Sequence, residues 1–295
     1  MKKELQIFLV CGVIAALSGV AATYFDPTET KQVALEPVQE IKARITVDES
    51  KLSGRAAVIF DPRTGDLLYG KNPELQLPLA SLTKIATALA VLSRNENQFV
   101  TITEADLLPE GDAGLRVGDV WPLKDLVAFG LTTSSNDAMA AASAATLSES
   151  QTVENMNAAA VTAGLAQSFF LNPTGLDLSE STAGAYGSAL DVAKLTTLLL
   201  STHADVFEAT VHPPKTHGTS GEGAESTLEP IWDMPGLIAA KTGYTDLAGG
   251  NLAAVVDVGL NQPVVIVVLG SGRDERFLDL RLLVGAVHEA RVRTQ

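Results

Sequence analysis

Hydrophobic and polar positions in the first part of the folded region alternate in short runs. Two apolar runs, RAAVIF from residue 55 and DLLY from residue 66, flank the segment DPRTG at residues 61–65. Asp, Pro and Gly in this order are typical of a tight turn between two strands. The pattern therefore predicts a β-hairpin.

From Ser81 the apolar positions follow a helical period, and alanine becomes frequent. Residues 81–94 (SLTKIATALAVLSR) place apolar side chains three and four apart, and Ser81 lies close to the expected N-cap. We therefore expect a helix that begins almost at Ser81. Ser188 and Asp191 have the spacing of a capping box at the start of a later helix. The same spacing predicts further helices over Leu123–Leu131, Asn136–Leu147, Val153–Ala163 and Ser188–Ser201.

After Pro235 the period changes back to that of strands. Strands at both ends of the domain, around a helical middle, predict a sheet built from segments that are distant in the sequence, and short links favour antiparallel pairing. The fold class is α+β, with an antiparallel sheet of about five strands flanked by helices and an inserted, mostly helical subdomain at about residues 81–235. A cleft between the two parts is the expected functional site. The late elements are strands over Leu237–Thr242, Leu252–Val258 and Val264–Leu269, turns at 248–250 and 261–263, and a helix over about Arg276–Arg291.

A different pattern precedes this domain. Residues 1–24 begin with MKKE and continue in an apolar stretch over Leu5–Tyr24, and about 20 residues match a hydrocarbon core of ~30 Å. Lys2 and Lys3 predict that the N-terminus is cytoplasmic and that the rest of the chain lies outside. Two interpretations stay open: an uncleaved signal anchor, and a signal peptide cut after Ala22.

Composition narrows the possible functions. The 295 residues include 21 Lys and Arg against 35 Asp and Glu, and the formal charge of −14 argues against a nucleic-acid partner. With 46% hydrophobic residues the chain can bury a large core, whereas residues 25–48 have mixed charges and no sustained period and are expected to be a linker. Cys11 is the only cysteine, so the chain forms no internal disulfide. The four histidines show no metal-ligand spacing; they are His203, His212, His217 and His288.

Three short motifs carry candidate chemistry. Ser81-Leu82-Thr83-Lys84 is a Ser-x-x-Lys motif that opens the first predicted helix, and Ser134-Ser135-Asn136 is a Ser-x-Asn motif between two predicted helices. Lys241-Thr242-Gly243 ends a predicted strand. The first two motifs are common in unrelated chains and the third is rarer, and none is convincing alone. Their joint occurrence in this order, each in its proper structural context, is what points to a shared chemistry.

The motifs predict acyl transfer through a Ser81 ester. A serine hydroxyl is a weak nucleophile at neutral pH and needs an adjacent base. Residues three apart share one face of a helix, so Lys84 should lie beside Ser81. Burial and a second cation, Lys241 across the groove, would lower the pKa of Lys84 so that its neutral amine can take the Ser81 proton.

The other residues of the motifs suit supporting roles. Ser134 can relay a proton between the two lysines and a leaving amine, and the Asn136 carboxamide can hold a substrate amide. The backbone N–H groups of Ser81 and Tyr244 are the expected donors to an oxyanion. Lys241-Thr242-Gly243 should form a substrate-binding strand on which the first two residues meet a carboxylate.

This motif set resembles that of the low-molecular-weight penicillin-binding proteins that act as D-alanyl-D-alanine carboxypeptidases. The resemblance covers roughly residues 50–295 and implies a β-lactamase/transpeptidase-like fold, so that residues 49–295 form a serine D,D-peptidase domain. It also implies peptidoglycan stem peptides ending in D-Ala-D-Ala as substrates, β-lactam antibiotics as acylating mimics, and no metal or organic cofactor. Further matching stretches are AAVIFDPRTGDLLYGKN, PLASLTKIATAL, TSSNDAMAAA, FLNPTGLD at 170–177, and KTGYTDLAGGNLAA.

The resulting prediction is a serine D,D-carboxypeptidase on the outer face of the cytoplasmic membrane, held by its N-terminal helix or exported if cleaved near Ala22. Better-known members of the family carry an additional C-terminal β-rich domain and a C-terminal amphipathic anchor. The present sequence ends after its last predicted helix, at Gln295. Anchoring is therefore expected to depend on the N-terminal segment.

Three alternatives stay open at this point. Endopeptidase or transpeptidase activity would need only a different leaving group or acceptor. A β-lactamase must hydrolyse its acyl-enzyme quickly, and class A enzymes use a Glu four residues before an Asn for that step. If Asn172 is that Asn, Ser168 occupies the Glu position, which predicts slow deacylation. The third alternative is a catalytically silent wall-binding module.

Overall fold

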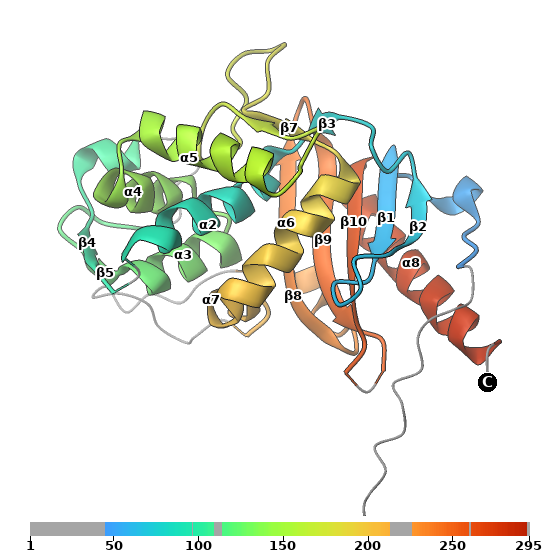
Figure 1. Ribbon diagram of the computed structural model, residues 1–295. Coiled ribbons are helices and arrows are strands. Elements are labelled where there is room, and N and C mark those ends of the chain that lie inside the picture. Colours follow the sequence, from blue (N-terminus) through green and yellow to red (C-terminus); the bar gives the residue numbers. More distant parts are fainter. Residues whose placement is uncertain (1–44, 96, 109–113, 213–225, 260, 294–295) are drawn as a thin grey trace, which may run out of the picture. The chain divides into compact units, whose positions relative to one another are not determined.

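Strands from the two ends of the described chain form one antiparallel sheet in the computed structural model (Figure 1). The structure describes residues 45–95, 97–108, 114–212, 226–259 and 261–293. Contacts divide the chain into residues 1–41 and 42–295, and every described residue belongs to the second unit. The predicted apolar segment Leu5–Tyr24 and most of the predicted linker lie outside the described residues. Among the helices that are described, none is both long and apolar enough to cross a membrane.

The five-stranded sheet has the order β2-β1-β10-β9-β8. The predicted hairpin pairs with the last strand, from Ala56 opposite Leu269 to Phe60 opposite Val265, so the start of the domain closes on its end. This arrangement confirms the predicted α+β class and a sheet of sequence-distant strands. The strands are β1 (Ala56–Phe60), β2 (Leu67–Lys71), β8 (Leu237–Thr245), β9 (Gly249–Asp257) and β10 (Pro263–Ser271).

Helices cover both faces of this sheet. α6 (Ala189–Thr202) packs against β1 and β10 on one face, and α8 (Glu275–Val292) packs against β9 and β10 on the other (Figure 1). Because both faces are covered, β1 is buried at every position and β9 and β10 are buried almost throughout. The continuous apolar runs in the sequence follow from this double burial.

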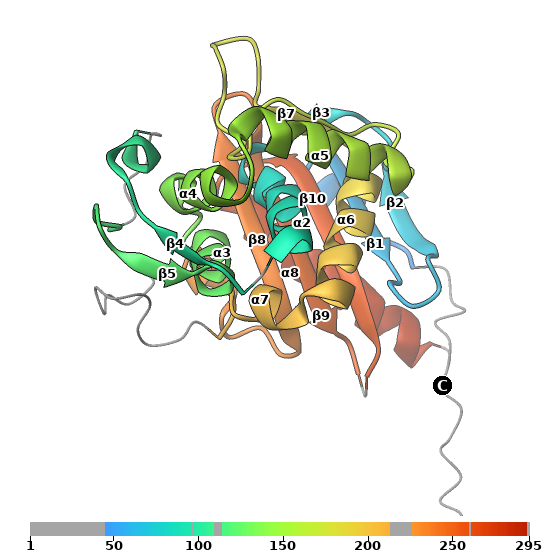
Figure 2. The same ribbon diagram turned by 60° about the vertical axis from the view of Figure 1, so that its left-hand side comes forward.

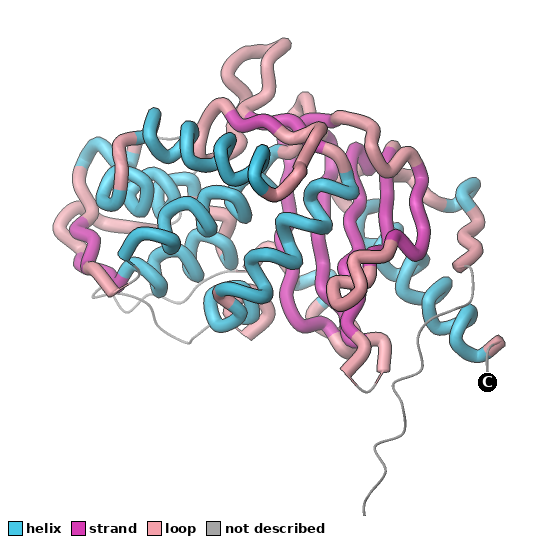
Figure 3. Tube along the Cα trace, viewed as in Figure 1, coloured by secondary structure: helices cyan, strands magenta, loops and turns pink. Residues whose placement is uncertain are grey.

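The remaining helices form a second part beside the sheet, with α2 (Thr83–Asn95) at its centre (Figures 2 and 3). α2 contacts α3 (Leu123–Thr132), α4 (Asn136–Thr146) and α5 (Glu149–Thr162), so its apolar face is enclosed. A short helix, α7 (Ala204–Glu208), follows α6. The predicted helices are therefore all present.

Helix starts follow from their capping residues. Ser135 caps α4 by accepting a hydrogen bond from Ala138 N at 3.0 Å. A capping box of Ser148 and Gln151 starts α5 four residues before the predicted position. Only half of the predicted capping box of α6 forms, because the Asp191 carboxylate accepts hydrogen bonds from Gln167 N and Ser168 Oγ instead.

The first helix was expected to begin almost at Ser81, and its regular α-helical part begins two residues later. Ser81 lies in a 3₁₀ turn, η2 (Ala80–Leu82), and α2 begins at Thr83. Thr83 Oγ1 donates to Ala80 O at 2.6 Å, and Ala80 has a positive φ of 48°. The turn thus holds Ser81 at the entrance of the helix.

Several elements have no counterpart in the predictions, because two to five residues are too few to show a period. The β8–β9 hairpin is also tighter than predicted: Gly249 and Gly250 belong to β9, and the turn lies at residues 246–248. The additional elements are η1 (Glu49–Lys51), β3 (Leu77–Pro78), β4 (Phe99–Thr101), η3 (Glu104–Leu107), β5 (Val120–Pro122), β6 (Phe169–Phe170), β7 (Ala185–Gly187) and η4 (Glu229–Ile231).

Candidate active site

The three predicted motifs meet where η2 packs against β8. Gly243 on β8 lies so close to η2 that a Cβ atom there would be 3.0 Å from Leu79 O and 3.2 Å from the backbone nitrogen of Ser81. The turn before α4 brings the second motif to the same place through its contacts with the two lysines. Segments separated by more than 150 residues thus form one site.

Lys84 is the centre of this site. Its side chain is fully buried, and Nζ lies 2.8 Å from Ser81 Oγ, 2.7 Å from Asn136 Oδ1 and 2.9 Å from Thr174 O. Burial lowers the pKa of the Lys84 ammonium to about 7. A neutral amine at this position has a lone pair that can accept the Ser81 proton.

Lys241 is the second buried cation. Nζ donates to Ser134 Oγ at 2.8 Å and to Thr242 O at 2.7 Å. Burial lowers the pKa of Lys241 well below its usual range, and the charges of Lys84 and Arg276 lower it further. The effect of a second cation therefore falls on Lys241, whereas burial accounts for the shift of Lys84.

Ser134 adopts a backbone conformation that is rare for serine, with a φ of 63°. Such a conformation costs of order 1 kcal/mol, and the cap that Ser135 gives to α4 fixes the residues around it. The Ser134 hydroxyl bonds to Lys241, and within the described residues it has no hydrogen bond to Lys84. Of the two lysines named in the predicted proton relay, Lys241 is the one that the structure connects to Ser134.

The two predicted oxyanion donors belong to segments that touch, because Tyr244 directly follows Gly243, and a Cβ atom on Gly243 would lie 3.2 Å from Ser81 N. Arg276 Nη1 donates to Gly243 O at 2.7 Å. Gly243 O and Tyr244 N–H belong to one planar peptide unit, so this bond fixes the direction of the N–H as well. The sequence analysis did not single out Arg276, which lies in the last helix.

The predicted carboxylate-binding residues are close to further hydroxyl groups. Thr242 Oγ1 donates to Thr227 Oγ1 at 2.7 Å, and Thr227 was not predicted to take part. The side chain of Tyr244 is 42% exposed, and the Arg273 guanidinium lies 5.0 Å from the centre of its ring. The exposed rim of the site thus has an aromatic and cationic character.

A loop between β6 and β7 supplies the third acceptor to Lys84. Asn172 Oδ1 accepts hydrogen bonds from Gly175 N at 2.7 Å and Thr174 N at 3.2 Å, which turns Thr174 O towards the lysine. Gly175 has a φ of 82°, and a Cβ atom there would overlap the carbonyl oxygen of Ala80. Asn-Pro-Thr-Gly is a turn sequence, and it lies in the stretch FLNPTGLD that carries part of the resemblance, but neither signal predicted a contact with Lys84.

Ser168, which occupies the position of the deacylating Glu of class A β-lactamases in the alignment above, forms its side-chain hydrogen bond away from Ser81. Ser168 Oγ donates to the Asp191 carboxylate at the start of α6. In the described part of the chain, no three His, Cys, Asp or Glu side chains gather in a way that could hold a metal ion.

Comparisons with known proteins find similar sequences over most of the chain. A protein family described as D-alanyl-D-alanine carboxypeptidase matches residues 43–272. A D-alanyl-D-alanine endopeptidase of Pseudomonas aeruginosa is 30% identical over 252 residues, which are 81% of this chain and 78% of the relative. The D-alanyl-D-alanine carboxypeptidase DacF of Bacillus subtilis is 30% identical over 227 residues, which are 74% of this chain and 57% of the relative.

The fold has close counterparts among solved structures. Penicillin-Binding Protein D2 from Listeria monocytogenes, in its ampicillin-bound form, aligns with a TM-score of 0.69 and 28% identity. The alignment covers 80% of this chain and 97% of that chain.

Proposed function

Since the chain belongs to the D-alanyl-D-alanine carboxypeptidase family, we propose that Ser81 is the nucleophile with which this serine-type D,D-peptidase removes the terminal D-Ala from peptidoglycan stem peptides. The observation that carries the proposal is the 2.8 Å contact between Ser81 Oγ and a buried lysine whose pKa is lowered to about 7. A serine beside a neutral amine is an activated nucleophile.

In the first step Ser81 Oγ attacks the carbonyl carbon of the penultimate D-Ala, and Lys84 takes the hydroxyl proton. The carbonyl oxygen becomes an oxyanion that the N–H groups of Ser81 and Tyr244 stabilise. The C–N bond then breaks, and the departing D-Ala amine takes a proton. Ser134, in contact with Lys241, is suited to deliver that proton, and the proton that Lys84 took from Ser81 replaces it through Ser134, so that Lys84 is neutral again before the second step.

In the second step water hydrolyses the Ser81 ester. Lys84 again acts as the base, so the proton taken from water returns to Ser81 Oγ when the ester bond breaks. Asn136 orients Lys84 through its 2.7 Å contact, and its carboxamide is the proposed partner of a substrate amide. Lys241 and Thr242 are the proposed partners of the terminal carboxylate.

β-Lactam antibiotics are proposed to acylate the same serine, because a strained amide can take the place of the D-Ala-D-Ala peptide bond. The Listeria relative in its ampicillin-bound form supports this proposal. Ser168 in the position of a deacylating carboxylate supports a slowly hydrolysed adduct rather than β-lactamase turnover.

The direct test of the function is D-Ala release. We expect the protein to release free D-Ala from Nα,Nε-diacetyl-L-Lys-D-Ala-D-Ala. The endopeptidase named among the relatives favours a second candidate reaction, cleavage of a cross-link between two stem peptides. A protein that cleaves cross-linked muropeptide dimers but releases no D-Ala from the tripeptide would be an endopeptidase instead.

We also propose that the apolar segment Leu5–Tyr24 holds the enzyme on the outer face of the cytoplasmic membrane. The length of the segment and the preceding Lys2 and Lys3 support this proposal. A mature protein whose intact mass begins at Thr23 would replace the anchor with a cleaved signal peptide.

A substitution at Gly243 tests the proposed oxyanion site. In Gly243→Ala the added methyl group would press on the backbone of η2, with Leu79 O at 3.0 Å and Ser81 N at 3.2 Å. Because backbone atoms must move, we expect the rate of acylation by benzylpenicillin to fall by about 10²-fold, as for loss of one oxyanion donor.

Gly285→Ala is the matched control for this substitution. Gly285 lies in α8 with no atom within 4 Å of an added Cβ, so acylation by this variant should equal that of the wild type. If Gly243→Ala is acylated at the wild-type rate, the close contact between η2 and β8 is not needed for acylation.

A further inference from the structure

A small sheet beside the proposed active site carries a row of ring-shaped side chains on one face. The sheet has the order β3-β7-β6, and β3 and β7 lie next to each other in Figures 1 and 2. Pro78 on β3 pairs with Tyr186 on β7, and Tyr186 pairs in turn with Phe169 on β6. Residues directly opposite each other in an antiparallel sheet point to the same face, so these three side chains form one row, the ring row.

The ring row is on the outward face of this sheet. Its neighbours along the strands, Leu77 and Phe170, are buried, as expected when successive side chains point to opposite faces. Phe169 is 43% exposed, and Pro78 and Tyr186 are half-buried. The Phe169 and Tyr186 rings are nearly parallel, with an interplanar angle of 8° and 5.8 Å between their centroids. An exposed row of rings on one sheet face is typical of a binding surface.

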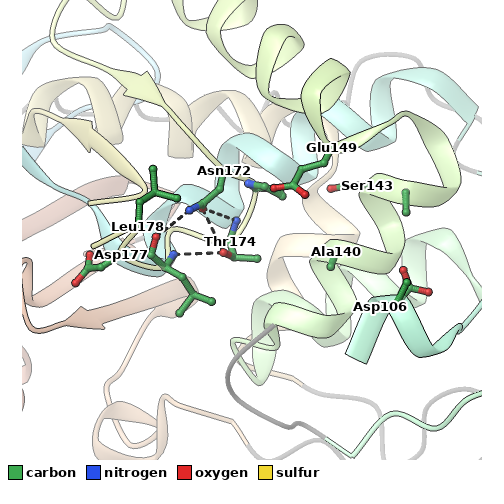
Figure 4. Close-up of a pocket in the computed structure, with 12 residues that line it drawn as sticks. Asp106, Ala140, Ser143, Glu149, Asn172, Thr174, Asp177 and Leu178 are labelled. Atoms are coloured by element: carbon green, nitrogen blue, oxygen red, sulfur yellow. Dashed lines mark hydrogen bonds between the residues drawn. The ribbon is translucent and has the colours of Figure 1, made fainter. Parts of the chain in front are cut away.

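The ring row is close to the reaction centre. Pro78 is three residues before Ser81, and three residues span at most about 11 Å. Neighbouring strands are about 4.8 Å apart, so the row extends roughly 10 Å from Pro78 to Phe169. The loop that follows β6 contains Thr174, which Figure 4 shows and whose carbonyl oxygen contacts Lys84 at 2.9 Å. Short segments therefore connect both ends of the row to the site.

The surroundings of the ring row are uncharged. Although the whole chain has a formal charge of −14, residues 75–82, 165–176 and 181–190 include no Asp, Glu, Lys, Arg or His. Gln76 is exposed beside β3 and donates Nε2 to Gln167 O at 2.7 Å. The Tyr186 hydroxyl accepts a hydrogen bond from Ala183 N at 2.9 Å, and its own hydrogen can donate to a ligand. Neutral rings flanked by amide and hydroxyl groups favour an uncharged ligand that is rich in such groups.

We propose that the ring row binds the glycan strand that carries the stem peptide, a chain of six-membered sugar rings with N-acetyl groups. The C–H groups on one face of a sugar ring carry partial positive charge and pack on the negative face of an aromatic ring. Consecutive sugar rings, joined by one oxygen atom, have a spacing similar to that of the Phe169 and Tyr186 rings. Gln76 and the Tyr186 hydroxyl bond to the polar groups of the sugars. This inference rests on the proposed function.

The length of the stem peptide fits this arrangement. When the penultimate D-Ala of a pentapeptide is at Ser81, three residues precede it, and they span roughly 10 Å when extended. The sugar is attached directly beyond them. Since the near end of the ring row, at Pro78, is within about 11 Å of Ser81, the sugar can contact the row while the peptide is in the site.

The test compares two substrates with the same pentapeptide ending in D-Ala-D-Ala. One carries an N-acetylated disaccharide on its N-terminal lactoyl group, and the other carries the lactoyl group alone. For the wild-type full chain, in a detergent without sugar groups, we expect kcat/KM for D-Ala release to be about fivefold higher for the disaccharide-linked peptide, the size of one aromatic contact. Because the contact is uncharged, the preference should not change with salt concentration.

Substitutions in the ring row should remove this preference. Phe169→Ala and Gln76→Ala should each bring the ratio of the two kcat/KM values towards one, while kcat/KM for the lactoyl peptide stays at the wild-type value. Phe169→Tyr keeps an aromatic ring and should keep the ratio. Phe99→Ala is the matched control, because Phe99 is 71% exposed on β4 in a different sheet, and its ratio should equal that of the wild type.

The outcomes separate this inference from the proposed function. Release of D-Ala from neither substrate by the wild-type protein would reject the proposed function and this inference with it. Equal kcat/KM for the two substrates, or a preference that survives in the Phe169→Ala/Gln76→Ala double variant, would reject the glycan-binding surface and leave the function intact.

Discussion

Ser81→Ala is expected to abolish acylation, with a loss of at least about 10³-fold in the rate of D-Ala release. The alanine has no oxygen to form the ester, while Lys84 keeps its other two acceptors, Asn136 Oδ1 and Thr174 O. Intact-mass spectrometry of the full chain with benzylpenicillin over time measures this directly. The wild-type protein should gain one adduct, and the variant none.

Ser93→Ala is the matched control for that experiment. Ser93 lies on the same helix as Lys84 but is exposed and bonds only to Ala90 O, so its replacement should leave the adduct unchanged. The melting temperature of Ser81→Ala should stay close to that of the wild type, because one hydrogen bond contributes about 1 kcal/mol. An adduct on the folded Ser81→Ala protein would reject Ser81 as the nucleophile.

Much of this architecture could be predicted because it depends on long periodic segments. The main helices were predicted from nine or more residues of one period, the late strands from apolar runs of six or seven residues, and the hairpin from a pair of runs around a turn. Their antiparallel arrangement followed from short links and from the strands at both ends of the domain. The antiparallel pairing of β1 with β10 joins the first and last strands of the sheet, as this prediction requires.

The start of the nucleophile helix could not be predicted, since it depends on contacts distant in the sequence. A regular α-helix from Ser81 would fit the local sequence, but η2 is fixed from outside by Gly175 against Ala80 and by Gly243 against Ser81. A single sequence carries no record of these contacts. Ser81 and Lys84 are nevertheless in contact as predicted, because a 3₁₀ turn also brings residues three apart close together.

The supporting groups of the site were missed for a different reason. Thr174 acts through its backbone carbonyl, which every residue possesses, so no residue type identifies it. Arg276 acts on Gly243 from the opposite end of the sequence and looks like an ordinary charge at a helix start. The sequence therefore predicted the site residues that act through side chains within the motifs. It did not predict residues that act through a backbone carbonyl or that reach the site only after the chain has folded.

Lys84→Met is expected to lower the acylation rate by at least about 10³-fold, because the variant keeps the length of the side chain but has no base. Ser81 remains in place, so residual acylation should no longer depend on pH around neutrality. The measurement is the rate of benzylpenicillin adduct formation by the wild type and the variant between pH 5.5 and 8.5.

The same lysine should set the pH dependence of the wild type. Only neutral Lys84 can take the Ser81 proton, so the acylation rate should rise with pH through a midpoint near the pKa of about 7. In the unfolded chain this lysine has its ordinary pKa of 10.5, so between pH 7 and 10.5 the unfolded state holds a proton that the folded state has lost. The unfolding free energy of the wild type relative to Lys84→Met should therefore increase with pH across this window, by at most about 1.4 kcal/mol per pH unit. A rate that is flat from pH 5.5 to 8.5, together with a stability difference that does not change with pH, would show that Lys84 stays protonated and that another group takes the proton from Ser81.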